Sequence, residues 1–158
     1  MPATALSDAT STDDHNDITL AAAAGLEVAR VELLTRLVES LTTTSFTRDS
    51  AFSLTTWLQR RAGFAATQAR QLVRQAGLLK QLPAFTNALR SGATSLVHLD
   101  TLTTVATEPR MGHLEEFAIQ LLEHTCNLSV DDYTRVCAYW AELADDNTKL
   151  PTSARAAT

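Results

Sequence analysis

The first long segment, from about Ile18 to Thr42, predicts a helix because its apolar residues recur every three or four positions. Its first half is rich in Ala, which suits close approach to another helix. We expect one broad side of this helix to be buried, since the apolar stripe is wide. The residues of this stripe are Val31, Leu34, Val38 and Leu41, widened by Leu33 and Leu37.

The rest of the chain predicts six shorter helices with similar periodicity. Gly63, Gly92 and Pro109 mark helix ends, and Pro83 suits a first helical turn. No stretch alternates apolar and polar residues as a strand does, so the sequence predicts an all-α bundle of about six or seven helices. The six helices begin near Ser53, Ala66, Pro83, Thr94 or Ser95, Met111 and Ser129.

The 158 residues, of which 45% are hydrophobic and 20% charged, are typical of one globular domain. Residues 1–17 are acidic and rich in Ser and Thr, which indicates a disordered tail. Residues 18–144 contain the helical patterns and are expected to form the domain. We interpret residues 145–158 as a linker or a second disordered tail.

Charge is distributed unevenly along the chain, whose net charge is −5. Residues 1–50 and 111–158 are each acidic, with eight acidic and three basic side chains. Residues 51–110 carry seven basic and two acidic side chains. The chain as a whole is therefore no general polyanion binder, but its centre is basic.

A helix-turn-helix pattern lies between Thr55 and Gln75. This motif needs small or apolar residues between two helices, a Gly at the turn and a polar outer face on the second helix. Gln59 and Ala65 depart from the pattern, since a small residue and a capping hydroxyl usually occupy these positions. The inward positions are occupied by Leu58, Ala62, Phe64, Ala69 and Leu72, with Gly63 at the turn.

The polar face of the second helix in this motif is suited to duplex DNA. Arg pairs with guanine edges and Gln with adenine edges, and Arg at a helix end contacts phosphate. We expect Arg70 and Arg74 to project together, with no acidic side chain in the patch. The alternative is that these side chains form an ordinary solvated face. The candidate DNA-binding residues are Arg60, Arg61, Thr67, Arg70, Gln71, Arg74 and Gln75.

No constellation in the sequence predicts catalysis or a metal site. Zinc or HNH-type chemistry needs several His with acidic or Cys partners in a compact site, whereas the four His are dispersed. Neighbouring carboxylates, as in Asp131–Asp132, diverge by about 100° on a helix. Gly-rich phosphate loops and nucleophile motifs are not found. We expect no enzyme activity, no metal and no cofactor.

Cellular location is inferred by default. Cys126 and Cys137 have neither a disulfide-framework nor a zinc spacing, which favours a reducing compartment. The amino terminus lacks a signal-peptide pattern, and the apolar stretch around Leu20 to Leu26 is too short to span a bilayer. The sequence predicts a cytoplasmic protein with no membrane contact.

A set of short motifs between Ser53 and Leu143 resembles the actinobacterial domain-of-unknown-function family 222. That family forms the amino-terminal helical part of the 13E12-repeat HNH-endonuclease-like proteins. The resemblance covers about three-quarters of the chain and implies a DNA-targeting role, but the HNH nuclease motif is absent here. The motifs are Ser53-Leu54-Thr55-Thr56-Trp57-Leu58, Ala69-Arg70, Leu72-Val73-Arg74, Leu82-Pro83, Ala88-Leu89-Arg90-Ser91-Gly92, and Ser95 with His98.

The same stretch is more distantly similar to the DNA-binding part of ParB-type partition proteins, which supports the DNA interpretation without fixing it. Two functions are therefore predicted. The first is a DNA-binding or targeting module that uses the Arg70–Arg74 helix. The second is a protein–protein or self-association module, with a homodimer formed through Val31, Leu34, Val38 and Leu41 of the long helix. The two are compatible, because reading a two-fold DNA site requires a dimer.

Overall fold

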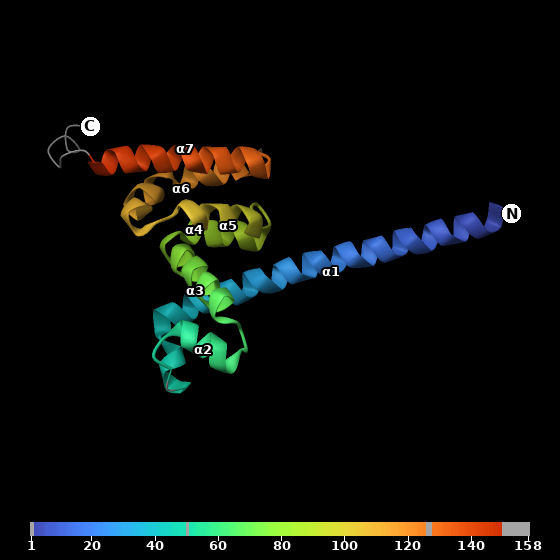
Figure 1. Ribbon diagram of the computed structural model, residues 1–158, viewed down its shortest axis with the longest axis horizontal. Helices are drawn as coiled ribbons and strands as arrows, with labels where there is room; N and C mark the ends of the chain where they lie inside the picture. The colour runs from blue at the N-terminus through green and yellow to red at the C-terminus, as the bar shows by residue number, and fades with distance from the viewer. Residues whose placement is uncertain (1, 50, 126–127, 150–158) are drawn as a thin grey trace.

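The computed structural model describes residues 2–49, 51–125 and 128–149 (Figure 1). Within these residues the chain forms seven α-helices, two short 3-10 helices and no strand, which confirms the predicted all-α fold. The elements are α1 (Pro2–Thr43), η1 (Ser45–Asp49), α2 (Leu54–Arg61), α3 (Ala66–Gln81), α4 (Pro83–Ser91), α5 (Leu96–Val105), η2 (Glu108–Arg110), α6 (Met111–Thr125) and α7 (Val130–Lys149).

Local sequence signals set several of the helix ends. The Ser53 hydroxyl accepts a hydrogen bond from the Thr56 amide at 3.2 Å and so caps α2. Ser129 caps α7 in the same way, through the Asp132 amide at 3.2 Å. Gly92 ends α4 with a φ of 79°, a left-handed conformation that a Gly adopts without strain.

Helix α5 begins differently, because its capping oxygen comes from a distant part of the chain. Ser95 precedes the helix, but its hydroxyl lies 2.7 Å from Nδ1 of His98 instead of bonding a backbone amide. The Leu96 amide donates to Oε1 of Glu27 on α1 at 3.0 Å. This carboxylate at a helix amino terminus is also favoured by the helix dipole. The bond links the start of α5 to the middle of α1.

Helix α1 is longer than the sequence predicts. Its first part includes residues 2–17, which are expected from composition to be a disordered tail. Residues 11–30 are exposed throughout. This part of α1 is therefore held by the backbone hydrogen bonds of the helix itself. In Figure 1 the amino-terminal half of α1 extends away from the other helices.

The other half of α1 belongs to the hydrophobic core. Leu34 and Leu37 are buried, and Val38 and Leu41 are partly buried against the core. This stretch of α1 contacts α3 and α4. The predicted burial of one broad side of α1 is therefore confirmed for its carboxyl-terminal half.

The remaining helices stack on α3 in layers. Helices α4 and α5 follow α3, and α6 and α7 cover them on the side away from α2 (Figure 1). Apolar side chains from every α-helix meet in one core, which includes Leu58, Phe85, Leu99 and Tyr133. Helices α2 and α3 pack together, and Leu58, Ala69 and Leu72 are buried as the helix-turn-helix pattern predicts. Phe64 is only partly buried, and Ala62 is exposed, contrary to the prediction for this position.

The carboxyl-terminal part of α7 continues past residue 144, where the sequence analysis places the start of a linker. Asp145, in this part of α7, accepts two hydrogen bonds from Arg110, Nε to Oδ1 at 2.8 Å and Nη2 to Oδ2 at 2.7 Å. The same guanidinium donates to the Val105 carbonyl at 3.0 Å. Residues 150–158 lie outside the described residues.

Candidate interaction surfaces

The turn between α2 and α3 forms the helix-turn-helix-like centre of the molecule. Gly63 has a φ of 73°, and the Phe64 amide reaches back to the Leu58 carbonyl at 3.3 Å. Ala65 precedes α3 and provides no side-chain cap, as its methyl group implies. Thr67 and Arg70, in the first turns of α3, are exposed.

Arg60 and Arg61 lie exposed in the last turn of α2. Nε of Arg61 is 4.0 Å from Oδ2 of Asp49, and the same Asp49 oxygen accepts a hydrogen bond from the Trp57 indole at 2.7 Å. An acidic side chain therefore lies beside this arginine, which contradicts the expected acid-free patch. Because both partners are exposed, the ion pair contributes little to stability. It nonetheless reduces the positive charge available at Arg61.

The five predicted residues of α3 have different environments. Thr67 and Arg70 are exposed, and Gln71 is half-buried. Arg74 is exposed, but its Nη2 donates to the Thr103 carbonyl of α5 at 2.9 Å. Arg70 and Arg74 are therefore not equivalent, since the second guanidinium is committed to a contact within the protein.

Gln75 is not on the outer face of α3, contrary to the sequence-based prediction. Its side chain is 0% exposed and its Nε2 donates to Oδ1 of Asp100 on α5. Its Oε1 is also buried and has no hydrogen-bond partner among the described residues. The physical reason is that α5 packs along the carboxyl-terminal half of α3. Gln75 thus cannot read a base edge without disrupting the core.

The predicted dimer face on α1 is also corrected by the structure. Leu34 is completely buried, and Val31, Val38 and Leu41 pack against the same core. These side chains are already removed from water within one chain, because α1 contacts α3 and α4. A second copy could not contact Leu34 unless the protomer opened.

Other apolar side chains of α1 are exposed on two sides of the helix: at about 100° per residue, Ile18 and Leu26 lie on one side, and Leu20 and Val28 lie on the opposite side. Ile18, Leu20, Leu26 and Val28 are 68%, 67%, 71% and 70% exposed. Each precedes the point at which α1 enters the core. The sequence holds a signal for this surface, since the apolar stretch around Leu20 and the neighbouring alanines suit helix contact. The apolar periodicity alone does not distinguish these exposed residues from the stripe of α1 that is buried in the core.

One apolar line of this surface continues into a groove between α1 and α3, which we call the α1–α3 groove. Its volume is about 550 Å³. Arg30 is its charged lining residue, and it forms no ion pair within the described part of the chain. Thr67 and Gln71, predicted to face DNA, line this groove. The complete lining consists of Leu26, Ala29, Arg30, Leu33, Phe64, Thr67, Gln68, Gln71 and Leu72.

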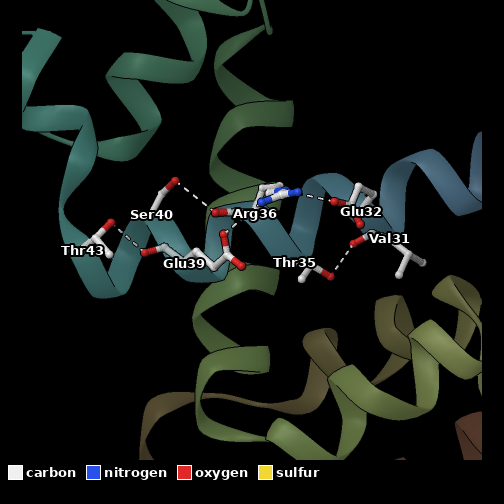
Figure 2. A network of polar contacts seen from close by, with 7 residues as sticks. All are labelled: Val31, Glu32, Thr35, Arg36, Glu39, Ser40 and Thr43. Atoms are coloured by element: carbon white, nitrogen blue, oxygen red, sulfur yellow. Dashed lines mark hydrogen bonds and ion pairs between the residues drawn. The ribbon is translucent and has the colours of Figure 1, made fainter.

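The polar residues that follow along α1 bond to one another (Figure 2). Arg36 donates to Glu32 at 3.0 Å and to Glu39 at 3.5 Å, and the Ser40 hydroxyl donates to the Arg36 carbonyl at 3.1 Å. These residues are exposed or half-buried, and their bonds are local to the helix. The exposed apolar line on this side of α1 therefore ends near Leu33.

Burial shifts the pKa values of three titratable side chains in the core. Burial lowers the pKa of His98, whose ring packs edge-on against Tyr133 with a centroid distance of 4.8 Å. Burial is also the main cause that raises the pKa of Tyr133, and it raises the pKa of Cys137 to about 11. A thiol with a raised pKa is a poor nucleophile. Within the described residues, no group of His, Cys, Asp and Glu is arranged to hold a metal ion.

None of the described helices combines the length and the apolar character needed to cross a membrane. No protein family, no curated protein and no solved structure matches this chain.

Proposed function

We propose that this chain is a non-catalytic helical module that self-associates through the amino-terminal half of α1. One observation carries this proposal: Ile18, Leu20, Leu26 and Val28 are about two-thirds exposed on a helix that projects from the body (Figure 1). Large apolar side chains grouped on one exposed element are typical of a contact surface.

Physical chemistry supports an oligomeric role for this half of the helix. A solitary helix in water is only marginally stable, because tertiary packing supplies most helical stability in proteins. Residues 11–30 of α1 have no such packing over most of their length. Association with another helix would bury the exposed Leu and Ile side chains and supply the missing stabilisation.

Leu26→Asp is expected to abolish this association. The change places a charge in the centre of the exposed apolar surface, where contact with a second chain would desolvate it. Sedimentation equilibrium should give a concentration-dependent dimer for the parent chain and a monomer for the variant. Leu143→Asp is the matched control, since Leu143 is an exposed leucine on α7. The Leu143→Asp variant should still form the dimer. A parent chain that is monomeric up to high micromolar concentration would contradict the proposed function.

We further propose duplex DNA binding as a second function, as the resemblance to domain-of-unknown-function family 222 implies. The supporting observation is that the side chains of Arg60 and Arg70 are exposed on adjacent helices, and that neither guanidinium forms a hydrogen bond or ion pair with described residues. The proposed DNA surface contains fewer residues than the sequence predicts, because Gln75 is buried and Arg74 contacts Thr103. Arg60 and Arg70 are therefore the residues expected to contact phosphate.

The double change Arg60→Ala and Arg70→Ala is expected to weaken duplex binding and lower its salt dependence. Each lost phosphate contact should reduce the slope of log K against log salt by about 0.9. Fluorescence anisotropy with a labelled duplex at several salt concentrations measures both quantities. Arg135→Ala is the control, because Arg135 is an exposed arginine on α7. The affinity of this variant for the duplex should match that of the parent chain. An equal loss of affinity per removed charge in the control would show that only net charge matters.

A further inference from the structure

The exposed apolar line on α1 is arranged as a helix-pairing seam. Ile18, Ala22, Leu26, Ala29 and Leu33 follow one another at steps of four, four, three and four residues, which keeps them on one face. The last three of these residues line the α1–α3 groove. The seam therefore starts on the free half of α1 and ends inside the groove.

We propose, as an extension of the proposed self-association, that the α1–α3 groove of each protomer receives the free amino-terminal half of α1 from a second copy, in antiparallel orientation. In this arrangement Ile18 of one protomer lies near Leu33 of the other, and the two Leu26 residues lie near the two-fold axis. Each contact then occurs twice, as a two-fold interface requires.

The shape of the protomer favours the antiparallel orientation. The body lies at the carboxyl-terminal end of α1, and the amino-terminal half is free (Figure 1). An antiparallel pair places each free half beside the other protomer's groove and keeps the two bodies at opposite ends. A parallel pair would place both bodies at the same end and would leave each groove beside the part of the partner helix that is already covered.

The charges of the two surfaces are complementary. Residues 11–20 carry Asp13, Asp14 and Asp17 and no Lys or Arg. The charged residue that lines the groove is the cation Arg30. An acidic segment therefore approaches a groove whose one charged lining residue is a cation, which favours the encounter of the two chains.

Small and apolar residues make close contact possible within the groove. Ala22 and Ala29 allow two helix backbones to approach, while Leu33 and Phe64 are only partly buried and have apolar surface left to cover. The seam ends where Arg36 and Ser40 form their own bonds on α1 (Figure 2). Residues 18–33 give a contact about 24 Å long, from the helical rise of about 1.5 Å per residue.

The test is site-specific photocrosslinking of the full chain. p-Benzoylphenylalanine replaces Ile18, which is 68% exposed, so the fold should tolerate it; circular dichroism of the labelled chain checks this. Irradiation should give a covalent dimer, and mass spectrometry should join position 18 to peptides of the other chain that contain Leu33 or residues 64–72. The same label at Tyr139, exposed on α7, should give no dimer.

The outcomes separate this inference from the proposed function. A sedimentation dimer whose crosslinks join position 18 to position 18, or to any other region, would overturn the groove and leave self-association intact. A dimer in sedimentation that gives no crosslink from position 18 would also overturn the groove contact and leave self-association intact. A chain that stays monomeric would overturn both.

Discussion

Gln75→Glu should be strongly destabilising, by about 3 kcal/mol or more at pH 7, because it places an unpaired charge in the core. The Gln75 side chain is completely buried and donates its amide hydrogen to Asp100. The substitution removes this donor and sets a second carboxylate beside the first. Urea denaturation followed by circular dichroism measures the free energy of unfolding in parent and variant.

The effect should depend on pH with a definite sign. Burial and the nearby Asp100 raise the pKa of the introduced carboxyl in the folded state above its value in the unfolded chain. The penalty is therefore complete above the folded-state pKa and decreases as the pH falls toward the unfolded value of about 4.3. Gln59→Glu, exposed on the neighbouring helix α2, should change stability by less than about 0.5 kcal/mol. A Gln75 variant as stable as this control would place Gln75 on the surface, where the sequence analysis put it.

Leu34→Ala should cost about 3 kcal/mol of unfolding free energy, since a fully buried leucine leaves a cavity when it is shortened. Leu34 joins α1 to the core, so the variant should also increase hydrogen exchange in the carboxyl-terminal half of α1. Thermal or urea denaturation of the monomer measures the first effect, and exchange by mass spectrometry the second.

Leu20→Ala provides the matched control for this prediction. It is the same change on the same helix, at a residue that is 67% exposed and outside the proposed pairing seam. Its effect should be below about 0.5 kcal/mol. If both variants lost stability equally, the amino-terminal half of α1 would be packed against the body instead of projecting from it.

The candidate DNA surface shows how far sequence patterns reach. They correctly predict that α2, Gly63 and α3 form a helical pair, because apolar spacing and a left-handed Gly are local features. They do not predict which polar residues of α3 are covered. Arg74 and Gln75 form hydrogen bonds with residues of α5 that are 29 and 25 positions away in the sequence, and no local signal predicts these contacts.

The sequence by itself determined the helical class, most helix boundaries and the caps at Ser53, Gly92 and Ser129, since these depend on interactions within a few residues. Only the tertiary structure decided which apolar face of α1 is used within the chain and which is left exposed. Leu34 and Leu26 have the same side chain on the same helix, yet one is buried and the other is 71% exposed. The physical reason is that burial depends on where α3, α4 and α5 end, and α1 extends beyond all of them.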